Sequence, residues 1–260
     1  MKNGILVTAR TASTRLPNKA LIPLYRDIPL IEHILRRAKN TNLSNKIILC
    51  TTQLKEDDIL CDIAVNCGVD FYRGSVEDKL DRWLGAVKNN EIDYFVTMDG
   101  DDPFCVPELI DLAFEQINSN NADFIEKENI ITGLFTYAIS TSSLEKVCNL
   151  KDSISTEMMW TYFKDTGLFN IQDLCNVPDL LLRSDIRLTI DYPEDLELFK
   201  KIFNIISGEQ NIDIFSVVDL LSKNTSLRNI NFFRQNEFIA NQKAKTSLKI
   251  KNSKDKNVFI

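Results

Sequence analysis

Short apolar runs and longer segments with helical spacing alternate along the first half of the chain. Four apolar runs predict buried strands, at residues 4–8, 46–52, 69–74 and 93–99. Four segments with apolar side chains three or four positions apart predict helices, at residues 29–39, 56–68, 75–88 and 107–118. Strands that alternate with helices of this length predict a mostly parallel sheet with crossover helices.

The second half of the chain is less regular. Apolar runs predict strands at residues 123–126, 133–140 and 185–191. Helical spacing predicts helices at residues 141–149, 153–164, 192–206 and 214–223. The predicted fold class is therefore α/β, with a mostly parallel mixed sheet flanked by helices. We expect one domain over residues 1–230 and a polar, basic C-terminal tail over residues 231–260.

Charge separates the body of the chain from its end. Residues 240–260 carry six lysines and one aspartate, whereas residues 1–239 carry 25 basic and 36 acidic residues, a net charge of −11. An acidic body argues against a nucleic-acid partner, which normally meets a basic face. The basic end suits either a flap or dimer contact against the body or a solvated terminus, and its composition favours the solvated terminus.

The chain offers no segment for a membrane or a zinc site. No run approaches the ~18 apolar residues that a membrane span needs, and the first apolar stretch is too short for a secretory signal. The six cysteines form no C-x-x-C pair, and one histidine cannot complete a zinc ligand set. The sequence therefore predicts a cytoplasmic protein without a membrane partner.

The loop after the first strand suits a polyphosphate. In an α/β sheet, ligands bind beyond the carboxyl ends of the strands. The loop ARTASTRLPNKAL (9–21) offers three cations and three hydroxyl groups, on Arg10, Arg15, Lys19, Thr11, Ser13 and Thr14. Arginine binds phosphate through two donors and lysine acts as a point charge. Without a glycine, the loop is neither a P-loop nor a dinucleotide fingerprint.

Two other strand ends carry carboxylates. Asp99, Asp101 and Asp102 lie within four residues, and acids packed this closely repel unless a cation such as Mg²⁺ lies among them. Asp191 ends a predicted strand just before a predicted helix. It is either the N-cap of that helix or a second metal ligand.

These segments resemble the cytidylyltransferases that make CMP-activated acidic sugars. That family includes CMP-Kdo and CMP-acylneuraminate synthetases and SpsF-like spore-coat polysaccharide proteins. The loop 9–21 is similar to the signature A-R-x-x-S-T-R-L-P-x-K, and RGSVEDKLDRW (73–83) to R-G-S-x-x-D-x-L-x-R-[YW]. VTMDGDDPFCVPELID (96–111) is similar to G-D-x-P-x-x-x-P-E-L-I-D, and RLTIDYPEDLELF (187–199) to R-L-T-x-D-x-x-x-D. The four motifs occur in the family's order.

The resemblance implies a GT-A-like (Rossmann-like) fold, a homodimer, and Mg²⁺ held by Asp101 and Asp191. It implies transfer of CMP from CTP to an acidic sugar or related small acidic acceptor, with release of pyrophosphate, in surface polysaccharide or glycoconjugate biosynthesis. The implied catalytic residues are Arg10, Arg15, Lys19 and Asp101, of which the three cations bind the triphosphate. The implied substrate-binding residues are Ala9, Ser13, Thr14, Ser75, Asp78, Arg82 and Asp99.

Two positions depart from the family pattern. SpsF-like proteins usually have E-H-V-T-P-Y where this chain has EMMWTYF (157–163), so Met158 stands in place of histidine. Thr97 stands where many relatives have arginine. Both positions lie near the part that would contact the acceptor, which predicts an unusual acceptor.

Three other interpretations remain open. Asp99-Gly100-Asp101 is a D-x-D sequence, the metal motif of GT-A glycosyltransferases that use nucleotide-sugar donors. Such an enzyme holds a diphosphate, however, and does not need three cations in the first loop. A phosphate or phosphonate acceptor would already be ionised and would need no general base. A catalytically silent binding subunit is the third, and the intact Asp101, Asp191 and Arg15 argue against it.

Overall fold

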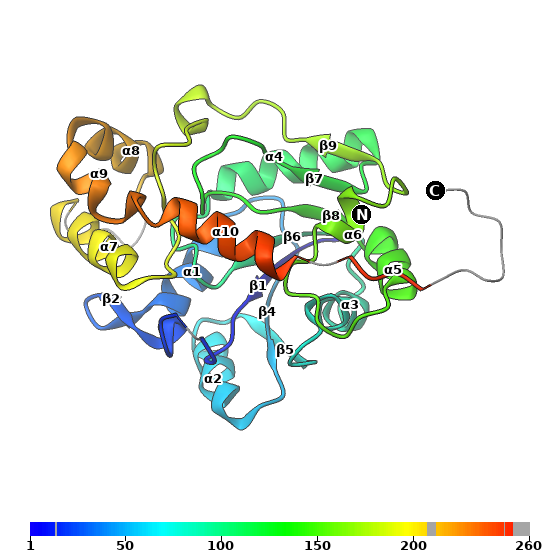
Figure 1. Ribbon diagram of the computed structural model, residues 1–260. Helices are drawn as coiled ribbons and strands as arrows, with labels where there is room; N and C mark the ends of the chain where they lie inside the picture. Colours follow the sequence, from blue (N-terminus) through cyan, green and yellow to red (C-terminus); the bar gives the residue numbers. More distant parts are fainter. Residues whose placement is uncertain (14, 207–211, 247, 252–260) are drawn as a thin grey trace.

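The computed structural model describes residues 1–13, 15–206, 212–246 and 248–251 (Figure 1). Its main sheet has seven strands in the order β5-β4-β1-β6-β8-β7-β9 within the described residues. The parallel half consists of β1 (Asn3–Thr8), β4 (Lys46–Thr52), β5 (Asp70–Gly74) and β6 (Tyr94–Asp99). The mixed half consists of β8 (Ala138–Ser140), β7 (Phe124–Glu126) and β9 (Ile171–Asp173), with β8 antiparallel to both β6 and β7. A separate hairpin is formed by β2 (Pro23–Tyr25) and β3 (Ile28–Pro29).

Helices cover both faces of the sheet (Figure 1). The α-helices are α1 (Leu30–Ala38), α2 (Asp58–Asn66), α3 (Lys79–Asn89), α4 (Pro107–Asn120), α5 (Thr141–Leu150), α6 (Thr161–Lys164), α7 (Pro193–Ile205), α8 (Ile214–Lys223), α9 (Thr225–Phe232) and α10 (Gln235–Lys245). Short 3-10 turns are η1 (Lys19–Leu21), η2 (Lys55–Asp57) and η3 (Asp179–Leu181). None of the described helices is long and apolar enough to cross a bilayer.

Strand β1 shows why the sheet needs cover on two faces. Side chains alternate across a strand, so Ile5 and Val7 join the larger core, under α1, α4, α7 and α8. Leu6 points the other way and packs in the second core with Trp83 of α3. All three strand side chains are fully buried. This two-sided burial confirms the predicted α/β class, with a mixed rather than wholly parallel sheet.

Three predicted elements differ from the structure. The predicted strand at 185–191 pairs with no strand; one isolated bridge joins Arg187 to Thr132. The predicted strand at 133–140 shortens to β8, because Gly133 has a left-handed φ of 97° where its backbone meets Leu188. The predicted helix at 153–164 shortens to α6.

The C-terminal boundary also differs. The predicted limit at residue 230 falls inside α9, and residues 235–245 of the expected tail form α10. In Figure 1, α10 runs in orange-red across the front of the molecule. Helix α10 has no buried residue, which explains why no apolar stripe predicted it. Residues 247 and 252–260 of that tail lie outside the described residues.

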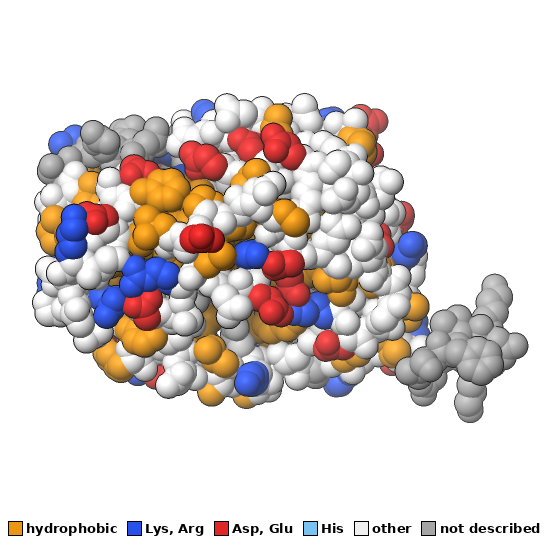
Figure 2. Space-filling model, turned by 90° about the horizontal axis from the view of Figure 1, so that it is seen from above, with side chains coloured by type: hydrophobic (Ala, Val, Ile, Leu, Met, Phe, Trp, Pro, Cys, Tyr) orange, Lys and Arg blue, Asp and Glu red, His pale blue; other side chains and the backbone are white. Residues whose placement is uncertain are grey.

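The surface seen from above has mixed chemistry. Figure 2 shows basic and acidic side chains interspersed among apolar ones on that face. This face therefore presents no broad patch of one sign. The absence of a nucleic-acid partner stays a prediction.

Candidate active site

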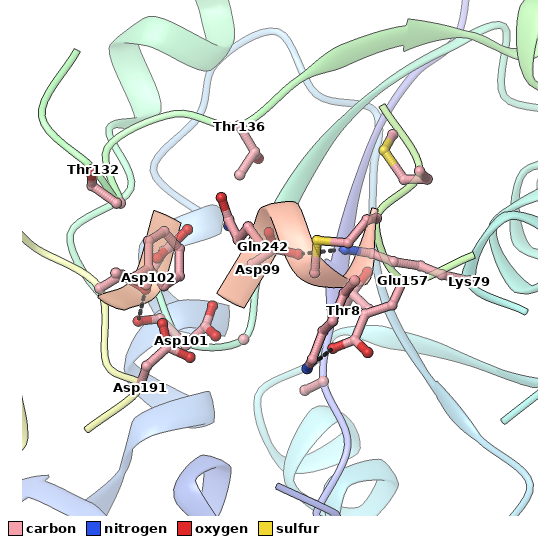
Figure 3. Close-up of a pocket in the computed structure, with 18 of the residues that line it drawn as sticks. Thr8, Lys79, Asp99, Asp101, Asp102, Thr132, Thr136, Glu157, Asp191 and Gln242 are labelled. Carbon is pink, nitrogen blue, oxygen red and sulfur yellow. Dashed lines mark hydrogen bonds and ion pairs between the residues drawn. The ribbon is translucent and has the colours of Figure 1, made fainter. Parts of the chain in front are cut away.

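A cavity of about 590 Å³ opens at the carboxyl ends of β1 and β6 (Figure 3). Its floor is the loop after β1 together with the acidic end of β6, and α10 forms its roof. Segments 126–137 and 157–160 complete the walls. The predicted residues that line it are Ala9, Arg10, Ser13, Arg15, Lys19, Arg82, Asp99, Asp101 and Asp191. The structure thus brings together residues of four motifs that are far apart in the sequence.

Two predicted residues, Ser75 and Asp78, are not among those lining the cavity. The Asp78 carboxylate caps α3 by accepting from the Asp81 backbone N–H at 3.1 Å, and it also accepts from Thr156 Oγ1 at 2.8 Å. Ser75 Oγ accepts from the Asp78 backbone N–H at 3.1 Å. Both residues therefore support α3 instead of facing a ligand, and Thr14 lies outside the described residues.

Arg82 differs from Ser75 and Asp78, the other two predicted residues of the motif at 73–83. It lines the cavity although it is only 4% exposed. Its Nη1 donates to the Ser75 carbonyl at 2.6 Å, so Ser75 fixes its direction. Burial lowers the pKa of Arg82, and its Nε has no hydrogen-bond partner among the described residues. Arg82 is therefore a buried cation with one unused donor.

The loop after β1 is anchored by Asp57, which sequence reasoning missed. Thr11 donates to Asp57 Oδ1 through both its backbone N–H and its hydroxyl, each at 2.7 Å. The Thr52 hydroxyl donates to the other carboxylate oxygen. Burial acts to raise the pKa of Asp57, but the hydrogen bonds from Thr52 and Thr11 hold it below its usual value. The only hint of Asp57 in the sequence was its position as an acid in the first turn of the predicted helix at 56–68.

Lys19 lies at the centre of the floor. Its Nζ is 2.5 Å from Asp101 Oδ2 and 3.1 Å from Asp191 Oδ1. It also donates to the Ile190 carbonyl at 3.1 Å. Burial acts to lower the pKa of Lys19, but the two carboxylates outweigh it and raise the pKa above its usual value. A charged ammonium therefore lies between two carboxylates from distant parts of the chain.

Asp191 faces the cavity and is not a helix cap. Arg15 pairs with its Oδ1, and Arg187 Nη2 donates to its Oδ2 at 3.1 Å. The N-cap of α7 is Tyr192, whose backbone N–H donates to Asp195 at 2.9 Å. The N-cap interpretation of Asp191 is therefore wrong. Burial acts to raise the pKa of Asp191, but Lys19 and Arg15 hold it below its usual value.

The end of β6 gathers three carboxylates. One oxygen from each of Asp99, Asp101 and Asp102 lies within 4.8 Å of the others. Burial raises the pKa of Asp101 although Lys19 opposes it, and burial and the neighbouring acids raise that of Asp102 further. Lys79 pairs with Asp99 Oδ1 at 2.9 Å, a cavity cation that the sequence did not single out.

The two departures from the family pattern lie in different places. Met158 lines the cavity directly. Thr97 is buried, and its Oγ1 donates to Thr136 Oγ1 at 2.9 Å; Thr136 in turn lines the cavity. Next to Met158, Glu157 pairs with Arg10 at 3.5 Å and with Lys245 of α10 at 3.8 Å. One carboxylate thus joins the floor to the roof.

Known proteins match most of the chain. The family model described as cytidylyltransferase matches residues 5–239. An uncharacterised protein of Methanocaldococcus jannaschii is 37% identical over 231 residues, covering 87% of this chain and 93% of its own length. The spore coat polysaccharide biosynthesis protein SpsF of Bacillus subtilis is 25% identical, covering 84% and 93%. The structure of a cytidylyltransferase from Leptospira borgpetersenii has a TM-score of 0.79 at 27% identity, covering 88% and 98%.

Proposed function

Because this chain belongs to the cytidylyltransferase family, we propose that it transfers CMP from CTP to a small acidic sugar or related acceptor. Pyrophosphate is the second product. The observation that carries this proposal is the meeting of Arg15 and Lys19 with Asp101 and Asp191 at one point of the floor. The cations suit a triphosphate, and the carboxylates suit a divalent metal ion.

The floor cations exchange partners when CTP binds. Arg10 pairs with Glu157, and Arg15 pairs with Asp191. Phosphate oxygens then replace these carboxylates as acceptors, and each guanidinium can bind them through two donors. The same cations stabilise the charge that develops on pyrophosphate, so catalysis is mostly positioning and charge neutralisation.

The freed carboxylates fit Mg²⁺. Asp101 and Asp191 would hold the ion, with Asp99 and Asp102 beside them. An all-oxygen donor set suits a hard cation, and the ammonium of Lys19 already acts as a cation at this place. When bound, Mg²⁺ supplies neutralisation of the triphosphate charge and polarises the α-phosphorus.

A sugar-like acceptor is supported by resemblance. SpsF is a spore coat polysaccharide biosynthesis protein, and it matches most of this chain. This supports a role in surface polysaccharide or glycoconjugate biosynthesis, and the motif resemblance supports a homodimer. A cytoplasmic location stays a prediction from the sequence. The glycosyltransferase alternative is weaker, since Arg10, Arg15 and Lys19 all line the cavity and suit a triphosphate better than a diphosphate.

Met158 favours a second candidate acceptor. Where SpsF-like relatives have a histidine, this chain places a thioether at the cavity wall, and a thioether cannot accept a proton. A phosphate or phosphonate acceptor is already ionised and does not need that base. The second candidate is therefore CMP transfer to such an acceptor.

A pyrophosphate-release screen tests the proposal. Each of the four NTPs is incubated with nonulosonic acids, Kdo, sugar phosphates and phosphonates, with and without Mg²⁺, and a parallel arm replaces the NTP with nucleotide sugars. We expect release from CTP with one class of acceptor and only in the presence of Mg²⁺. Cleavage of a nucleotide sugar without pyrophosphate release would instead support the glycosyltransferase, and no nucleotide turnover in any arm would contradict the proposal.

A further inference from the structure

The second half of α10 lines the cavity but lies beyond the family match, which ends at residue 239. Six residues of the helix line the cavity: Gln235, Phe238, Ile239, Asn241, Gln242 and Lys245. Their spacing of three and four places them on one side of the helix. Three of the six, Asn241, Gln242 and Lys245, therefore lie beyond the matched region.

Polar contacts set the rotation of α10. Gln235 Nε2 donates to Thr132 Oγ1 at 3.1 Å, and Asn241 Nδ2 donates to the Tyr192 hydroxyl at 3.1 Å. Between them, the guanidinium of Arg187 lies 4.4 Å from the ring centre of Phe238. Because three successive turns are fixed in this way, the residue one turn after Phe238 must face the cavity.

That residue is Gln242. Its side-chain carboxamide makes no hydrogen bond to any described residue, whereas the carboxamides of Gln235 and Asn241 are both used. Figure 3 shows Gln242 extending from α10 into the cavity that Thr136 and Asp99 also line. A carboxamide offers two donors and one acceptor. The roof thus presents an unused, neutral hydrogen-bonding group to whatever fills the cavity.

The distribution of charge indicates which substrate meets it. The loop cations that suit the triphosphate belong to the floor. The wall formed by segment 126–137 offers hydroxyl groups, on Thr132, Thr136 and Tyr137, beside one carboxylate and one ammonium, on Glu126 and Lys127. Hydroxyl and carboxamide groups both donate and accept, which suits the hydroxyl groups of a substrate, whereas a polyphosphate only accepts. The roof and this wall therefore face the second substrate.

We propose that Gln242 is a specificity-determining residue for the acceptor, because its carboxamide hydrogen-bonds a hydroxyl group of a polyhydroxylated acceptor. The inference rests on the proposed function, since it requires a second substrate beside CTP. It places part of the acceptor specificity of this chain in the second half of α10, which lies beyond the family-matched region.

Calorimetry with a non-hydrolysable CTP analogue tests this without turnover. Wild-type protein, Gln242→Ala and the control Asn236→Ala are saturated with α,β-methylene-CTP and Mg²⁺, then titrated with each acceptor of the screen. Asn236 is on the exposed side of the same helix and does not line the cavity. Alanine favours helix, so neither change should unfold α10. We expect Gln242→Ala to weaken acceptor binding about tenfold, with analogue affinity unchanged.

Three results would overturn the inference. They are unchanged acceptor binding by Gln242→Ala, an equal loss in Asn236→Ala, or a loss of analogue affinity that moves Gln242 to the nucleotide site. Wild-type protein that binds the analogue but none of the acceptors would also overturn it. Failure of the wild-type protein to bind the analogue at all would instead contradict the proposed function. In turnover, Gln242→Ala should raise the acceptor KM and leave kcat unchanged.

Discussion

The floor of the cavity is held by ion pairs between loop cations and carboxylates. Its roof, α10, is held by hydrogen bonds from the carboxamides of Gln235 and Asn241, by contacts with the buried Arg187, and by one exposed ion pair of Lys245. On the floor, Arg15 and Lys19 already have partners, so binding CTP there exchanges one set of ionic contacts for another. On the roof, the Gln242 carboxamide has no hydrogen-bond partner among the described residues, so a ligand adds a contact. The difference predicts that floor changes affect CTP and turnover, while roof changes affect the acceptor.

The two regions meet at Arg187. Its Nη2 donates to Asp191 on the floor at 3.1 Å, and its Nη1 donates to Gln235 on the roof at 3.1 Å. Its Nε also donates to the buried Asp195 at 2.9 Å. A fully buried guanidinium with three acceptors holds a fixed position. The placement of α10 and the direction of the Asp191 carboxylate therefore depend on the same side chain.

Asp101→Asn should have the largest effect. The amide keeps the shape of the carboxylate but removes the charge that pairs with Lys19 and that Mg²⁺ requires. We expect kcat to fall about 10³-fold, in the range known for losing one electrostatic contact to a transition state. The melting temperature should stay close to that of the wild type. Asp62→Asn, an exposed carboxylate on α2, is the control, and wild-type rates for Asp101→Asn in saturating Mg²⁺ would contradict the metal site.

Arg15→Lys should have the next largest effect. The change keeps the charge but removes the two-donor geometry, and it also removes the guanidinium that lies 5.3 Å from the ring centre of Tyr192. We expect CTP affinity, measured by calorimetry, to fall about 10- to 100-fold. Arg26→Lys is the matched control, because Arg26 lies 5.1 Å from the ring centre of Tyr25 and does not line the cavity. Equal CTP affinity for wild type and Arg15→Lys would show that the two-donor geometry of Arg15 does not contribute to CTP binding.

The floor was largely predictable from sequence, and the roof was not. The loop cations and Asp101 lie in short contiguous motifs at the carboxyl ends of strongly apolar strands. Because such strand ends meet at one edge of an α/β sheet, the sequence predicts that these residues lie together. Asp57 was missed because its role depends on contacts across the sheet, to Thr11 and Thr52. Gln242 was missed because α10 buries no side chain and so leaves no apolar pattern.

The link between apolar pattern and burial also explains the wrongly predicted strand at 185–191. Ile190 and Leu188 gave residues 185–191 the alternation of a strand, and both are buried. The alternation arises because this segment crosses the core beside Gly133, without a partner strand. A periodic pattern reports which side chains are buried, but it does not report whether the backbone pairs.

Asp57→Asn should change stability with a defined pH dependence. Because the folded-state pKa of Asp57 is depressed, its stabilisation is present above the usual aspartate pKa of about 3.9 and is lost as pH falls through the folded-state value. The difference in free energy of unfolding between wild type and Asp57→Asn should therefore be largest near neutral pH and shrink in acid. Urea unfolding at a series of pH values measures it. Glu56→Gln, the exposed neighbour, should show no such trend, and a pH-independent difference would contradict the role of the charge.

Lys245→Met should have the smallest effect on CTP affinity. It tests whether a cation of the roof helps to bind CTP, as the floor cations do. The Lys245 ammonium and the Glu157 carboxylate are 3.8 Å apart, and their side chains are 48% and 47% exposed. Solvent screens such a pair, so its loss costs about 0.2–1 kcal/mol at most, which is less than about a fivefold change in CTP affinity. Lys243→Met is the matched control, since Lys243 is exposed and does not line the cavity. A loss in Lys245→Met as large as that in Arg15→Lys would place the end of α10 in the triphosphate site, and the division between a floor that binds CTP and a roof that binds the acceptor would no longer hold.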